Sequence, residues 1–168
     1  MAETQQESVA ATYAKALLAT TEKSGATAAM LSELESLVRD VLENQPKFAA
    51  ALSSPRLSTD EKLNLLDRVF AGRVSPELLR FLKVVARHER LDALPAIGAS
   101  YRKLVNAALG RAAVTVITAQ PLPEDLRGHV ISTWEARLGK QIDLTTDTDP
   151  DLLGGMVVRV GDTVYDAS

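Results

Sequence analysis

The sequence predicts a helical bundle followed by a small α+β domain, and the main reason is a change in hydrophobic period along the chain. Up to residue 109, apolar residues recur every three or four positions, as in helices that bury one face. From residue 113 they alternate, as in strands with one buried face. Gly110 stands between the two patterns. We therefore expect a six-helix bundle over residues 1–109 and an α+β domain over residues 110–168.

The expected helices of the first part begin and end at recognisable signals. They cover residues 8–23, 27–43 and 48–52, and three more begin at Ser58, Ser75 and Asp92. Ser58 and Glu61 have the spacing of a capping box, and Ser75 precedes a proline at the first helical position. The first helix is expected to bury a face made of Val9, Tyr13, Ala16, Leu17 and Thr20.

The second part is expected to contain a strand over residues 113–118, a helix over 124–138, a strand over 141–147 and a hairpin. The helix would turn Leu126, Val130, Trp134 and Leu138 inward. The two-residue turn Gly161-Asp162 pairs Val158 with Tyr165. That register places Met156, Val158, Val160 and Tyr165 on one apolar face. On the other face, Arg159 and Asp166 lie diagonally and could form an ion pair.

Composition excludes several classes of function. The net charge of −3 provides no basic surface for nucleic acid, and the absence of cysteine excludes thiolate metal sites. No apolar run reaches the roughly 18 residues that span a bilayer. Asp147, Asp149 and Asp151 alternate like a calcium loop, but Leu152 replaces its required glycine. We expect no catalytic residue, metal or cofactor, and a turn or bulge role for Gly154-Gly155.

The fifth helix carries an apolar residue on its charged side. At about 100° per residue, its inner face consists of Leu78, Leu82, Val85 and Ala86. The opposite face consists of Glu77, Arg80, Arg87 and His88, with Val84 in its middle. Val84 is compatible with an ordinary exposed valine or with an anchor in a partner-docking groove. His88 lies at the C-terminal end of this helix, where a cation interacts favourably with the helix dipole.

Several stretches of this sequence carry a family resemblance. They are Thr12 to Leu17, Ser53 to Pro55, Lys62 to Leu66, Phe81 to Leu91 and the stretch from Leu152 to Ser168. Together they resemble the delta subunit of F-type ATP synthases, whose mitochondrial counterpart is the oligomycin-sensitivity-conferring protein. In that family a basic helix normally follows the Asp-x-Ser run, which is Asp166 to Ser168 here. The α+β domain is therefore expected to lack the family's last helix.

The resemblance implies a non-catalytic stator subunit that couples rotor torque to ATP synthesis. The helical domain would bind N-terminal helices of the alpha subunits in the catalytic head, and the second domain would bind the peripheral-stalk b subunit. By this resemblance, the groove that binds the alpha subunit would contain Tyr13, Ala16, Arg80 and Val84. The protein would be a monomer within a hetero-oligomeric complex, peripheral to the cytoplasmic face of the bacterial inner membrane and without insertion into it.

Two alternatives from other classes are weaker. Helical bundles of this size also bind RNA, but the acidic balance and the lack of a Lys/Arg stripe argue against an RNA-binding protein. A small-molecule enzyme could use the Gly154-Gly155 loop, but no paired acid and base stand nearby.

Overall fold

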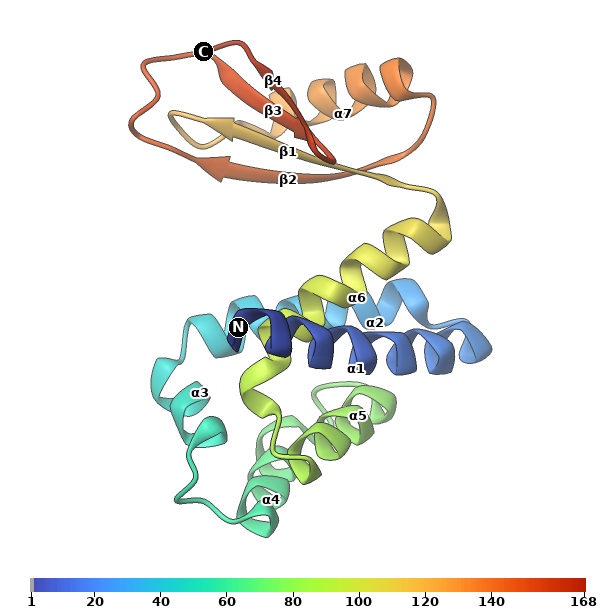
Figure 1. Cartoon of the computed structure of the whole chain (residues 1–168), viewed down its shortest axis with the longest axis vertical. Helices are drawn as coiled ribbons and strands as arrows, with labels where there is room; N and C mark the ends of the chain where they lie inside the picture. The colour runs from blue at the N-terminus through green and yellow to red at the C-terminus, as the bar shows by residue number, and fades with distance from the viewer. Residues whose placement is uncertain (1) are drawn as a thin grey trace. The chain divides into compact units, whose positions relative to one another are not determined.

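The computed structural model describes the backbone of residues 2–168 and the side chains of residues 4–168. It has the α+β class that the sequence predicts (Figure 1). Its contacts divide the chain into two compact units, one up to Val105 and one from Asn106 to Ser168. The sequence places the boundary a few residues later, at Gly110. The contacts place it a few residues earlier, and within the second unit Asn106 donates to Asp143 (Nδ2–Oδ2 2.7 Å).

The first unit is helical. Its α-helices are α1 (Ala2–Ser24), α2 (Thr27–Ser36), α3 (Pro46–Ser53), α4 (Thr59–Phe70), α5 (Pro76–Arg87) and α6 (Leu94–Leu109). A π-helical segment, η1 (Leu37–Glu43), continues α2, and a 3-10 turn, η2 (Leu91–Ala93), precedes α6. Their shared core centres on fully buried side chains, among them Leu34, Leu78, Leu82, Leu94, Ile97 and Tyr101.

Two of the predicted helix starts are confirmed. The Glu61 amide donates to Ser58 Oγ (3.2 Å), and the Ser58 amide donates to Glu61 Oε2 (2.7 Å), which is a complete capping box. Ser75 Oγ accepts from the Leu78 amide at 3.2 Å. The predicted cap at Asp92 is wrong, because Asp92 lies inside the 3-10 turn and α6 begins after it.

The predicted continuous helix over residues 27–43 changes to π geometry at Leu37. In a π-helix the hydrogen bonds join residues five apart, so residues five apart lie on the same side of the helix. Leu37 and Leu42 are both buried. An α-helix would turn them to different sides, and the wider helix lets both leucines reach the same core.

The predicted inner face of α1 is rotated from the one that the structure buries. The buried residues are Ala10, Ala14, Leu17 and Thr21. Of the predicted face, Leu17 is buried, Val9 and Tyr13 are half-buried, and Ala16 and Thr20 are exposed. The small side chains of Ala10 and Ala14 face the core, and the neighbouring stripe with Tyr13 and Ala16 is left open.

A hydroxyl pair joins α1 to α6 inside the first unit. Thr21 Oγ1 lies 2.9 Å from the hydroxyl of Tyr101, and that hydroxyl donates to the carbonyl of Thr27 at 3.1 Å. Both side chains are fully buried. Burial raises the pKa of Tyr101 above its ordinary value of about 10, and the bond to Thr21 acts in the opposite direction.

The second unit is a sheet with α7 (Glu124–Leu138) on one face, and its strand order is β2-β1-β3-β4. The strands are β1 (Ala112–Thr118), β2 (Ile142–Thr148), β3 (Met156–Val160) and β4 (Thr163–Asp166). β1 and β2 are parallel and α7 connects them, whereas β3 and β4 form the hairpin. The predicted hairpin register is confirmed, because Val158 faces Tyr165. The core consists of Val114, Val116, Val130, Trp134, Ile142, Leu144 and Val158.

Three details of the second unit differ from expectation. Leu126 is 49% exposed, because steps of four residues drift about 40° each around a helix and carry Leu126 about 80° from Trp134. Tyr165 packs against Trp134 with ring centroids 5.2 Å apart but remains 38% exposed on the edge strand. Among the described residues Asp166 is not paired with Arg159. It accepts from the amide and hydroxyl of Ser168 instead, which lowers its pKa.

We predict that the two units are separable by limited proteolysis, because Ala107 to Gly110 are exposed. Chymotrypsin should cleave after Leu109 and release a fragment that retains its helical circular dichroism. Loss of all helical signal upon this cleavage would contradict independent folding of the first unit.

We predict that Tyr101→Phe lowers the free energy of unfolding by about 1–3 kcal/mol at pH 7, because it removes a buried hydroxyl that two groups contact. The raised pKa means that the unfolded chain loses this proton first as the pH rises, so the parent loses stability above about pH 10. The difference in the free energy of unfolding between the parent and Tyr101→Phe should therefore shrink between pH 9 and pH 11. Urea unfolding followed by circular dichroism measures it, and a deficit that is constant over this range would refute the assignment.

Candidate partner-binding groove

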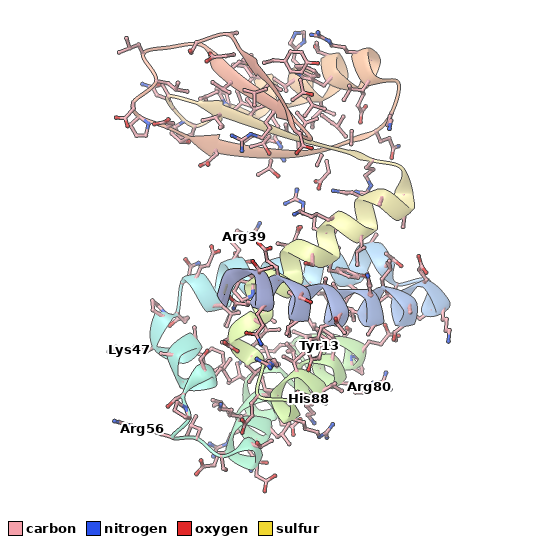
Figure 2. All side chains as sticks on the ribbon, viewed as in Figure 1. Tyr13, Arg39, Lys47, Arg56, Arg80 and His88 are labelled. Atoms are coloured by element: carbon pink, nitrogen blue, oxygen red, sulfur yellow. The ribbon has the colours of Figure 1, made fainter. Side chains whose placement is uncertain are left out.

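An apolar groove of about 630 Å³ lies between α1 and α5. Figure 2 shows Tyr13, Arg80 and His88 gathered where these two helices lie side by side. The wall from α1 contains Thr12, Tyr13, Ala16, Leu17, Thr20 and Thr21. The wall from α5 contains Glu77, Arg80, Phe81, Val84 and His88, and Met30 of α2 completes the lining.

The structure brings together the residues that the sequence and the resemblance single out. Tyr13 and Ala16 line the groove from α1, and Arg80 and Val84 line it from α5. Val84 is 40% exposed, whereas Leu78, Leu82, Val85 and Ala86 on the opposite face of α5 are fully buried. The predicted two faces of α5 are therefore confirmed. Partner binding by these four residues stays a prediction.

The groove is open because of the way α1 packs. Ala10 and Ala14 face the core, and Tyr13 and Ala16 occupy the adjacent stripe of the same helix. Ala16 has the smallest side chain of this lining, so it leaves space that a longer side chain would fill. The result is a groove with an apolar floor, and the separation of α1 and α5 sets its width.

A hydrogen bond at one end and a ring contact at the other join the two walls of the groove. At one end, the hydroxyl of Ser24 in α1 donates to Glu77 Oε2 over a long 3.5 Å. At the other end, the rings of Tyr13 and His88 meet edge to face with centroids 6.1 Å apart. Between these ends the lining is mainly apolar. An amphipathic helix could bury its apolar face there and keep its polar side chains at the rim.

His88 lines the groove, and the sequence interpretation places it on the Val84 face of α5 but assigns it only a role at the helix end. Its Nδ1–H donates to the carbonyl of Val84 at 2.9 Å, and its ring contacts Tyr13. Arg80 Nε donates to the carbonyl of Pro76 at 3.3 Å, which holds its guanidinium along α5. The spacing of Arg80, Val84 and His88 by four residues was the signal that these side chains share one face.

The other positions considered from the sequence have structural roles. Among the described residues no three potential ligands cluster as a metal site, and none of the described helices is long and apolar enough to cross a membrane. Asp149 Oδ1 accepts from the Asp151 amide at 3.0 Å within its own turn. Gly155 has a φ of +74°, and a Cβ there would clash with the carbonyl oxygen of Ala167.

Residues 9–168 match the family described as the ATP synthase delta (OSCP) subunit. The chain belongs to this family. It is 41% identical to the ATP synthase subunit delta of Rhodopirellula baltica, over 96% of this chain and 71% of that protein. It is 36% identical to the subunit delta of Symbiobacterium thermophilum, over 95% of this chain and 86% of that protein.

A chain in the cryo-EM structure of the Toxoplasma gondii mitochondrial ATP synthase hexamer has the same fold. The TM-score is 0.69 at 24% identity, and the match covers 94% of this chain and 88% of that chain. As a member of the delta family, this chain is a stator subunit of ATP synthase and not a catalytic subunit. Membership supports the stator function over the RNA-binding alternative.

We predict that substitutions on the two faces of α5 differ in kind. Val84→Glu should change the free energy of unfolding by less than about 0.5 kcal/mol, because Val84 is exposed. Leu82→Glu should unfold the helical unit, because it would bury an unpaired carboxylate in a fully closed site. Urea unfolding followed by circular dichroism distinguishes them. A Val84→Glu protein that is as unfolded as Leu82→Glu would show that Val84 belongs to the core.

Proposed function

We propose that this protein links the catalytic head of ATP synthase to its peripheral stalk and resists the torque of the rotor. In this proposal the six helices of residues 1–109 form one bundle that binds an N-terminal helix of an alpha subunit. Residues 110–168 bind the end of the b subunit. The protein would act as a monomer within the complex, peripheral to the cytoplasmic face of the membrane.

The groove between α1 and α5 is the observation that supports head binding most directly. It is apolar along its floor, and its charged side chains Glu77 and Arg80 lie at the rim. An amphipathic helix presents anchors at intervals of three and four residues, which suits such a groove. Val84 would be a central anchor contact, and Tyr13 would contact the helix from the opposite wall.

Ala16 would matter for its small size. A helix can approach the floor of the groove closely only where the wall residues are short. A larger side chain at this position would fill the space that the incoming helix needs. Arg80 is exposed at the rim, and its guanidinium would pair with an acidic side chain on the polar edge of the bound helix.

A helix in an apolar groove is a mechanically suitable connection for a stator. Its contacts are distributed along several turns, so a lateral force is shared among many side chains. Binding of the b subunit by the second unit rests on the family alone. The second unit does present exposed apolar side chains to solvent, among them Leu153 and Val164.

We predict that Ala16→Leu and Val84→Glu each weaken binding of a peptide with the N-terminal sequence of the alpha subunit. Ala16→Leu should weaken it by about 1–3 kcal/mol, because the added side chain fills the groove. Val84→Glu should weaken it by about 2 kcal/mol or more, because a desolvated apolar contact becomes an unpaired charge. Isothermal titration calorimetry on the full chain measures both.

Ala19→Leu is the matched control. Ala19 is also an exposed alanine of α1, but it does not line the groove. It should bind the peptide as tightly as the parent. Parent-like binding by Ala16→Leu and Val84→Glu together would refute the groove as the alpha-subunit site.

A further inference from the structure

Glu33 of α2 lies outside the groove, but its carboxylate contacts the start of the helix that forms one groove wall. Glu33 Oε2 accepts from the hydroxyl of Ser75 at 2.8 Å and from the Ser75 amide at 3.2 Å. Both bonds are partly buried and join positions 42 residues apart in the sequence. They connect α2 directly to the N-terminal end of α5.

Ser75 is the residue on which the start of α5 depends. Its side chain caps the helix by accepting from the Leu78 amide, and Pro76 occupies the first turn. An ionised carboxylate beside a helix N-terminus is favoured by the helix dipole and forms stronger hydrogen bonds than a neutral acceptor. The two bonds from Ser75 to Glu33 therefore join the N-terminal end of α5 to α2.

This position lies next to the end of the proposed docking groove. A neighbouring hollow of about 340 Å³ is lined by Glu33 and Ser75 and shares Met30, Glu77 and Arg80 with the groove. Met30 is one turn before Glu33 on α2. A polar contact across this end, between α1 and α5, is the 3.5 Å bond between Ser24 and Glu77, which is exposed and longer. The bonds from Glu33 are thus the shorter restraint on this end of α5.

We propose that Glu33 is a positioning residue for partner docking, which holds the N-terminal end of α5 at the distance from α1 that a bound helix requires. The part of this inference that concerns binding rests on the proposed function. Glu33 does not line the groove and acts through Ser75. A wall that is already in its bound position needs no ordering when the helix arrives, so pre-organisation increases affinity.

A general effect on stability is the alternative, and Glu35 provides the matched control. Glu35 is on the same helix and its Oε1 pairs with Arg102 Nε of α6 at 3.4 Å. Neither Glu35 nor Arg102 lines the groove. Removing either glutamate breaks a polar connection between helices, but only Glu33 connects to the groove wall.

The binding experiment compares the parent, Glu33→Ala, Glu33→Gln and Glu35→Ala as full chains. The probe is the alpha-subunit N-terminal peptide, titrated under conditions where circular dichroism shows each protein to be folded. Glu33→Ala should bind about tenfold more weakly or worse. Glu33→Gln should recover most of the affinity, because its amide oxygen can accept both bonds from Ser75. Glu35→Ala should bind like the parent.

A second measurement needs no ligand. The chain contains no cysteine, so spin labels at Ala19→Cys in α1 and Arg80→Cys in α5 report one distance across this end of the groove. The parent and Glu35→Ala should give one narrow distance distribution. Glu33→Ala should give a broader distribution, because α5 is no longer held at Ser75.

The outcomes separate this inference from the proposed function. Parent-like affinity of folded Glu33→Ala would overturn the inference, as would an equal loss in Glu35→Ala. If the parent itself does not bind the peptide, the proposed function fails and the spin-label distances decide about Glu33. An unchanged distribution in Glu33→Ala would then overturn the positioning role, and a broadened one would support it.

Discussion

Burial of one face of α5 is the constraint on which the helical unit depends. Leu78, Leu82, Val85 and Ala86 are fully removed from solvent on that face. Because opposite faces of a helix are fixed relative to each other, this burial also places Val84 and Arg80 on the side of α5 that lines the groove. The same hydrophobic contacts that stabilise the helical unit therefore position the surface proposed to bind the head.

Hydrogen bonds define the relative positions of helices that hydrophobic packing alone leaves undefined. Apolar packing is non-directional and tolerates small shifts of one helix along another. Hydrogen bonds with defined partners select one arrangement, as between Tyr101 and Thr21 or between Glu33 and Ser75. Such bonds add modest net stability but strongly disfavour alternatives in which the buried groups are unpaired. A stator that transmits force needs this definition of position as much as it needs stability.

The second unit uses a different division of roles. Its core is the face of the sheet that α7 covers, and Trp134 of that core contacts Tyr165 on the edge strand. The guanidinium of Arg137 lies about equally close to both aromatic rings, 4.9 Å from Trp134 and 5.0 Å from Tyr165. This cation–π contact joins α7 to the edge strand. The unit is thereby closed on one side by side chains that come from its helix and its last strand.

Sequence alone determined the features that depend on a few neighbouring residues: the capping box at Ser58, the start of α5 at Ser75, the hairpin register and the two faces of α5. Each of these follows from local geometry. Tertiary structure decided which of two adjacent stripes of α1 is buried, because the choice depends on Ala10, Ala14 and Thr21 fitting against other helices, with Thr21 reaching Tyr101. It also decided the π turns at Leu37 and the contact of the His88 ring with Tyr13. These depend on partners distant in the sequence, and no local pattern contains them.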